Sequence, residues 1–297
     1  MKDLTPEQLA ATSRLFSSSV VRELARKGRS PLFARLARQS LLPATLQNST
    51  PVSAVFEAAF RLLRRQGLRH EYIYKAALTH RILLGKHNLR TASMLNEFRV
   101  GDCKADLAIL NGTGTVYEVK SERDSLTRLT RQIAAYRSVF ASVVVIAGEN
   151  HVDAVLEAVP DDVGVLRLDS RFYISKVRDA VDSPERTSSA AIFDAIRTQE
   201  AKLILRGLGM SVPDVPNTEM HAALRKKFIK LDAREAHEGM VRTLKKTRNL
   251  LPLCELVERL PPSLRTAALS VPLRRLDHER LVEAVNTRLC DALRWAA

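Results

Sequence analysis

The stretch that decides the fold runs from Asn96 to Phe140 and reads NEFRVGDCKADLAILNGTGTVYEVKSERDSLTRLTRQIAAYRSVF. Residues 104–110 alternate well enough to predict a half-buried strand. Residues 111–114 form a turn cluster with two glycines, which accept positive φ. Residues 115–120 predict a second strand. The whole stretch therefore predicts strand, tight turn, strand, tight turn, strand and helix, with residues 104–120 as a β-hairpin.

Charged side chains lie on both strands of this hairpin. The apolar face of the first strand is expected to consist of Ala105, Leu107 and Ile109. Asp106 faces away from it, and on the second strand Glu118 and Lys120 share one face because side chains two apart point the same way. Two carboxylates can hold a hard divalent cation such as Mg²⁺, and a lysine can orient the attacking water. The alternative interpretation is a solvated hairpin face with a Glu118–Lys120 surface pair.

A helix and a buried strand are expected next. Residues 121–140 predict an amphipathic helix that begins at Ser121 or Asp124. Its apolar stripe comprises Leu126, Leu129, Ile133, Tyr136 and Phe140. Gln132 lies one turn before Tyr136, at the edge of that stripe. Residues 142–148 (SVVVIAG) are typical of a strand buried on both faces, so the unit predicts a right-handed crossover between parallel strands.

The residues now quoted resemble those of the PD-(D/E)XK nuclease superfamily. The similarity consists of Asp106, the Glu-Val-Lys run at 118–120, and the helix and strand that follow. Gln132 to Tyr136 resembles the QxxxY element of the RecB-like and phage-exonuclease branches. The resemblance covers residues 71–168, about a third of the chain. Three short runs within it, at 71–75, 96–98 and 117–121, are similar to an uncharacterised bacterial group of that superfamily.

The resemblance implies a fold, a cofactor and a set of site residues. The fold would be α/β, with a mixed central sheet of the restriction-endonuclease-like type flanked by helices, and the cofactor would be Mg²⁺ or Mn²⁺. The implied metal ligands are Asp106, Glu118 and the backbone carbonyl of Val119. Lys120 would be the catalytic lysine, and Gln132 and Tyr136 would support the site or the substrate backbone.

The acidic residue that usually precedes this motif has two candidates. Glu97 is expected across the hairpin from Asp106, and Glu71 opens a predicted helix at a distance more typical of the superfamily. Glu97 is the preferred candidate here. The residue before Asp106 is Ala105 rather than proline, a departure that the superfamily tolerates.

The charge of the chain favours a polyanionic partner. Its 297 residues carry a formal net charge of +14 at pH 7, spread along the sequence. Nucleic acid is the commonest partner of such a protein, so DNA is expected, with RNA as the alternative. The aromatic content of 5% argues against an extended base-stacking surface for single strands. Nothing in the pattern favours a particular oligomeric state.

Several other classes of protein are disfavoured. The three cysteines, Cys103, Cys254 and Cys290, are not at metal-ligand spacing and are typical of a reducing compartment. No apolar run is long enough to cross a membrane and the start does not resemble a signal peptide. A cytoplasmic protein without a membrane partner is therefore expected.

The flanking segments predict helices. Residues 1–50 are expected to be a helical extension that starts at Thr5-Pro6, residues 51–180 the nuclease-like core with about five strands, and residues 181–297 a basic helical region. Further helices are predicted at 53–66, 71–84, 189–208 and 218–250, the last with a possible break at Gly239.

The sequence therefore predicts a metal-dependent nuclease that hydrolyses DNA phosphodiester bonds. The competing hypothesis is a non-catalytic nucleic-acid-binding or adaptor module that uses the same fold, because a fold does not by itself fix a function.

Overall fold

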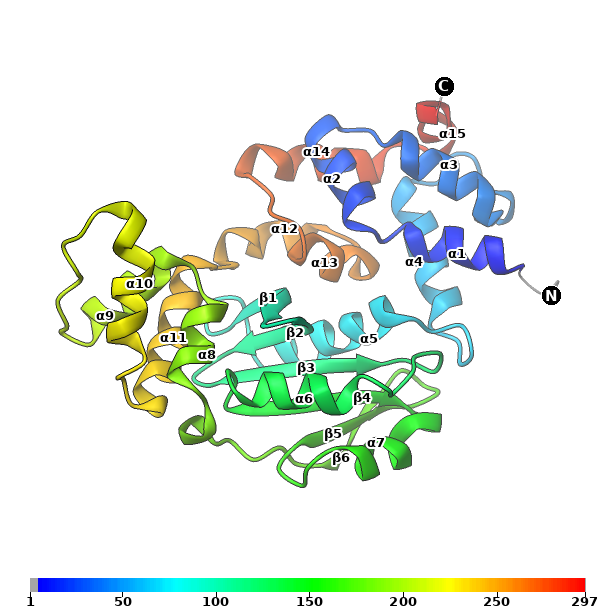
Figure 1. Cartoon of the computed structure of the whole chain (residues 1–297). Coiled ribbons are helices and arrows are strands. Elements are labelled where there is room, and N and C mark those ends of the chain that lie inside the picture. The colour runs from blue at the N-terminus through cyan, green and yellow to red at the C-terminus, as the bar shows by residue number, and fades with distance from the viewer. Residues whose placement is uncertain (1–4, 297) are drawn as a thin grey trace. The chain divides into compact units, whose positions relative to one another are not determined.

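The computed structural model describes residues 5–296, which divide into two compact units (Figure 1). One unit combines the described residues up to 80 with those from 251 onward, and the other holds residues 81–250. The segment expected for the nuclease-like core, 51–180, is thus shared between the units, whereas residues 181–250 belong with the sheet. No helix among residues 5–296 combines the length and the apolar character needed to span a membrane.

The first unit is built from helices of both ends of the chain. Its helices are α1 Pro6–Arg14, α2 Ser18–Lys27, α3 Pro31–Ser40, α4 Val52–Leu63, α5 Glu71–Leu78, α12 Cys254–Arg259, α13 Pro262–Leu269, α14 Arg275–Asn286 and α15 Leu289–Leu293. The predicted start of α1 is confirmed, because Thr5 and Gln8 cap each other's backbone N–H groups. The helix predicted over 71–84 is α5 followed by a π-helical turn at Thr79–Leu83.

The second unit contains a six-stranded sheet whose strand order follows the chain. The strands are β1 Ser93–Val100, β2 Cys103–Leu110, β3 Gly114–Lys120, β4 Ser142–Gly148, β5 Gly164–Leu168 and β6 Ile174–Arg178. Strand β3 pairs parallel with β4 and β4 with β5, while the other neighbours are antiparallel. The expected mixed α/β sheet is confirmed. The expected five strands omit β6, an edge strand with no buried residue and no apolar run.

The register places the charged residues of β3 on one face with apolar neighbours from β4. Glu118 lies beside Val145 and Lys120 beside Ala147, and directly paired residues point to the same face. On the other side, the pairing of β2 with β3 ends at Leu107 and Tyr117. The expected apolar face of Ala105, Leu107 and Ile109 is not regular. Ala105 packs in one cluster with Ala108 and Leu110, because the alternation breaks near Asp106.

Helix α6, Leu129–Arg137, covers this charged face of the sheet, as the ribbon of Figure 1 shows. Its predicted start at Ser121 or Asp124 is wrong. The Asp124 carboxylate accepts hydrogen bonds from the backbone N–H and the hydroxyl of Ser121, at 2.7 Å each. Such side-chain to backbone bonds compete with helix formation, so residues 121–128 form a loop.

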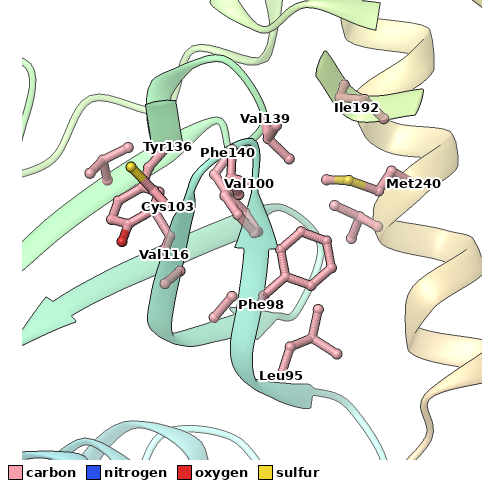
Figure 2. Packing of buried hydrophobic residues seen from close by; sticks show 14 of the residues in the cluster. Leu95, Phe98, Val100, Cys103, Val116, Tyr136, Val139, Phe140, Ile192 and Met240 are labelled. Atoms are coloured by element: carbon pink, nitrogen blue, oxygen red, sulfur yellow. The ribbon is translucent and has the colours of Figure 1, made fainter. Parts of the chain in front are cut away.

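The remaining helices of this unit are α7 Val152–Ala158, α8 Ser189–Ala195, α9 Thr198–Gly207, α10 Asn217–Phe228 and α11 Ala233–Thr247. Figure 2 shows the apolar core that α8 and α11 share with the sheet, where Met240 and Ile192 lie near Phe98. The single helix predicted over 218–250 is wrong, because the chain forms two helices, α10 and α11, separated at residues 229–232. The possible break at Gly239 does not occur, because α11 begins after the Asp232 cap and continues through Gly239. A side chain at Gly239 would collide with Ile204 of α9, so glycine there permits close packing.

Helix α11 buries a histidine against the residue that precedes β4. Nε2 of His237 accepts a hydrogen bond from the Ala141 N–H at 3.2 Å, and the residue is 1% exposed. Burial lowers the pKa of His237 from 6.5 to about 4; Asp182 opposes this shift, while Arg186 and Arg234 add to it. The folded protein therefore keeps His237 neutral down to about pH 4.

We expect this histidine to make stability depend on pH. Because its pKa is lowered on folding, its contribution is fully present above pH 6.5 and is lost as the pH falls from 6.5 toward 4. The loss amounts to about 3 kcal/mol in the free energy of unfolding. Glutamine can still accept the Ala141 bond but does not titrate, so His237→Gln should flatten this part of the profile. Urea unfolding at several pH values measures it, with His221→Gln on α10 as the control; equal slopes would contradict the assignment.

Candidate active site

The centre of the candidate site is an ion pair on the covered face of β3. Nζ of Lys120 lies 2.8 Å from Oε1 of Glu118, and the two side chains are 6% and 3% exposed. Each charge loses most of its hydration at this depth, which costs several kcal/mol unless other polar groups compensate. The predicted common face of Glu118 and Lys120 is confirmed, and the alternative of a solvated surface pair is excluded by their burial.

Helix α6 supplies those compensating groups from residues one turn apart. Oε1 of Gln132 accepts a hydrogen bond from Lys120 Nζ at 2.9 Å. The hydroxyl of Tyr136 lies 2.9 Å from Oε2 of Glu118 and 3.0 Å from the carbonyl oxygen of Lys104. A hydroxyl has one proton, so these two oxygens compete for it. Burial, and then the negative charges of Glu118 and Asp106, raise the pKa of Tyr136, so it remains a neutral donor.

Asp106 lies where β2 and β3 part. Its Oδ2 accepts a hydrogen bond from the backbone N–H of Val119 at 2.8 Å, one residue beyond Glu118. The backbone pairing of the two strands has ended at this point, so a side chain takes the place of the ladder. The negative charge of Asp106 is close enough to raise the pKa of Tyr136, as the charge of Glu118 does. The structure therefore brings Asp106, Glu118, Lys120, Gln132 and Tyr136 together.

The two candidates for the additional acidic residue belong to different compact units. Glu97 is opposite Asp106 in the hairpin, as predicted, but the pairing of β1 and β2 skips both residues, and Glu97 has a φ of 53°. Its side chain is 61% exposed and lies 3.0 Å from Nζ of Lys104. Glu71 belongs to the other compact unit, where it forms an ion pair with Lys75 one turn later.

The site offers oxygen ligands for a hard cation, though not a dense cluster. Asp106 and Glu118 supply two carboxylates, and each ionised carboxylate has about four lone-pair positions. One hydrogen bond to each Glu118 oxygen therefore leaves capacity for a metal ion. Mg²⁺ commonly uses one or two carboxylates and keeps several waters, so the donor set fits it. Among residues 5–296, no three His, Cys, Asp or Glu side chains are grouped to hold a metal ion.

Two residues near the site were not predicted. Lys104 offers its carbonyl to Tyr136 and its ammonium to Glu97, so it links the buried site to the rim. The sequence could have indicated Lys104 as a residue near the site, because it lies two residues before Asp106 on the same strand. Cys103 is buried in the same cluster as Tyr136, although nothing in the sequence distinguished it from a core residue.

Comparison with known proteins gives one family and two individual similarities. The profile of the family described as Bacteriophage P4 protein cII matches residues 64–251, which is more than half of the chain. Protein cII of Enterobacteria phage P4 is 33% identical over 114 residues, which cover 37% of this chain. The chain spans about two fifths of that relative's length (39%). A structure of a protein of unknown function from Silicibacter pomeroyi has 17% identity and a TM-score of 0.26, over 54% of this chain and 82% of that one.

We expect the buried pair to be sensitive to the loss of one partner. Lys120→Met leaves Glu118 buried without its counter-charge, which should lower the free energy of unfolding by about 3–5 kcal/mol. Adding Glu118→Gln removes the unpaired charge and should restore part of that loss. Lys104→Met is the matched control, because its exposed pair with Glu97 should contribute under about 1 kcal/mol. Urea unfolding of the four proteins measures these changes; equal losses for Lys120→Met and Lys104→Met would contradict the expectation.

Proposed function

We propose that this chain, which belongs to the bacteriophage P4 protein cII family, hydrolyses phosphodiester bonds of DNA with a divalent metal ion. The observation that carries the proposal is the buried Glu118–Lys120 pair, with Asp106 beside it and Gln132 and Tyr136 closing it from α6. We further propose that the sheet is of the restriction-endonuclease-like type, since an antiparallel hairpin, a crossover helix and a parallel strand carry these residues in the order that the resemblance implies.

Asp106, Glu118 and the carbonyl of Val119 are the groups that would hold the metal ion. A bound Mg²⁺ or Mn²⁺ would polarise the phosphate and lower the pKa of a coordinated water. The Val119 N–H fixes one Asp106 oxygen, so that carboxylate is already oriented at the end of the paired strands. A group that is fixed before the substrate arrives needs little reorganisation when the reaction begins.

Lys120 is the proposed catalytic residue. Its ammonium group has three donors, of which two are directed to Glu118 and Gln132, so one remains for a water or a phosphate oxygen. The positive charge offsets the negative charge that develops on the phosphate during in-line attack. Gln132 and Tyr136 are positioning residues, because they act through Lys120 and Glu118.

DNA is the proposed substrate because the chain carries a net charge of +14, which favours a polyanion. RNA has the same backbone charge and is the alternative substrate. Competition between the two at one stated salt concentration distinguishes them, because such binding weakens steeply as salt rises.

A second candidate function follows from the sparse ligand set. Within the described part of the chain, no third acidic residue joins the two carboxylates as a metal-binding group, and each Glu118 oxygen already accepts a hydrogen bond. A protein in which this network only holds the sheet and α6 together would bind nucleic acid as an adaptor without cleaving it.

We expect Lys120→Ala to abolish metal-dependent cleavage. Supercoiled, linear and single-stranded DNA should be incubated with the wild type and the variant in Mg²⁺, Mn²⁺ or EDTA. The variant should be slower by about 10²–10³-fold, as when one charge-stabilising donor is removed from an active site. Lys246→Ala, an exposed lysine of α11, is the control for the charge change. If the wild type and Lys120→Ala are equally inactive on every substrate yet bind DNA, the adaptor becomes the better assignment.

We expect metal binding to depend on Asp106. Isothermal titration of the wild type with Mn²⁺ should give a binding isotherm that Asp106→Asn weakens at least about tenfold, because one of two charged ligands is lost. Asp153→Asn removes an exposed carboxylate of α7 and should leave the isotherm unchanged. Identical isotherms for the wild type and Asp106→Asn would place the metal ion elsewhere.

A further inference from the structure

A cavity apart from the candidate active site lies in the sheet-containing unit. It is a cavity of about 560 Å³, within the roughly 300–1,000 Å³ that is common for small-molecule sites. Its walls come from the segment after α5 and from β5, β6 and the loop between these strands. The residues that matter for its chemistry are Arg81, Lys86, Leu166, Tyr173 and Lys176.

This cavity lies on the opposite face of the sheet from the candidate active site. Leu166 pairs with Ile146, and Ile146 pairs with Val119. Paired residues share a face, and Val119 points away from the face that carries Glu118 and Lys120. The residues that line this cavity are therefore not part of the candidate active site around Glu118 and Lys120.

The loop between β5 and β6 holds Tyr173 out of the core. Oδ1 of Asp169 accepts hydrogen bonds from the N–H groups of Arg171 and Tyr173, at 3.0 and 2.8 Å. Phe172 is buried with a φ of 63°, a conformation that a bulky residue adopts only when its surroundings impose it. The next residue, Tyr173, is 57% exposed. It is the one aromatic residue among the strongly exposed large hydrophobic residues of 5–296.

Positive charge lies beside this exposed ring and along the cavity. The guanidinium carbon of Arg81 lies 5.8 Å from the centre of the Tyr173 ring. Lys86 and Lys176 line the same cavity. Lys176 is 2.8 Å from Asp179, but both side chains are more than half exposed, so that pair is weak and can yield to a ligand. Within residues 5–296, neither Arg81 nor Lys86 forms an ion pair with a carboxylate.

We propose that this cavity binds one nucleotide unit, with its base stacked on Tyr173 and its phosphate held by Arg81, Lys86 and Lys176. Every base presents a π-face, so one exposed ring binds a base without requiring a particular sequence. Cations attract the phosphate, and arginine also stacks on aromatic planes. A single tyrosine accommodates one base, which agrees with the low aromatic content of the chain. The unit is either a free nucleotide or one residue of a single strand, and the proposal does not depend on hydrolysis at Glu118 and Lys120.

Binding in EDTA tests the proposal without interference from cleavage. The probes are fluorescein-labelled dT12 and rU12, followed by anisotropy, and unlabelled thymidine 5′-monophosphate and AMP, followed by titration calorimetry. We expect Tyr173→Leu to weaken binding by roughly 5- to 100-fold, the effect of losing one stacked base. Tyr173→Phe keeps the ring and should bind like the wild type. Arg81→Ala with Lys86→Ala should weaken binding and reduce its salt dependence.

Matched controls distinguish binding in this cavity from binding through the overall positive charge of the protein. Arg206→Ala removes one exposed cation of α9 and should leave binding unchanged. Circular dichroism and the melting temperature of Tyr173→Leu check that the fold is intact. If Tyr173→Leu unfolds, Arg81→Ala with Lys86→Ala tests the same cavity. If Tyr173→Leu loses binding of all probes, the cavity is a site for free nucleotides. If the wild type binds no mononucleotide and Tyr173→Leu loses binding of the oligonucleotides, the cavity is a site for a single strand. Equal affinities of the wild type and Tyr173→Leu for every probe, or no binding of any probe, would overturn the proposal.

Discussion

The second unit depends on how the buried pair of Glu118 and Lys120 is satisfied. Two charges with under a tenth of their side chains exposed destabilise a sheet face unless every remaining donor and acceptor finds a partner. The partners, Gln132 and Tyr136, are one helical turn apart, so only one face of α6 can supply both. That requirement fixes the rotation of α6 about its axis over β3. Since α6 connects β3 to β4, it also fixes the crossover that makes these strands parallel.

The position of Asp106 follows from an irregularity in the sheet. In a regular ladder, the Val119 N–H would donate a hydrogen bond to a backbone carbonyl of the neighbouring strand. Here the pairing of β2 with β3 stops at Leu107 and Tyr117, and the Asp106 carboxylate accepts that hydrogen bond instead. The neighbouring strand is also irregular, because Glu97 adopts positive φ and the register of β1 with β2 passes over Glu97 and Asp106. Disturbed pairing at this point allows an acidic side chain of β2 to approach the end of β3.

The sequence predicted the strands of the site and the common face of Glu118 and Lys120, because period-two alternation reports side-chain direction directly. It failed where local hydrogen bonds compete with periodicity. The apolar stripe from Leu126 suggested an earlier helix start, but Asp124 takes the Ser121 N–H and the helix begins at Leu129. Strand β6 was missed because an exposed edge strand needs no apolar pattern. Arg81 and Tyr173 meet only through the tertiary fold, so no local pattern could have shown their cavity.

The energetics of the buried network bear on why such a network is present at all. The neighbours of Glu118 and Lys120 on the same face, Val116, Val143 and Val145, are apolar and fully or almost fully buried. Replacing a buried ion pair by apolar residues of similar volume is often neutral or stabilising, so stability alone does not favour charges at this place. Register does not require them either, because the apolar face already specifies it. The strand therefore carries a buried charged pair, with Asp106 as a second carboxylate beside it, that stability does not require. This difference between what stability needs and what the strand carries supports the proposed catalysis over the adaptor.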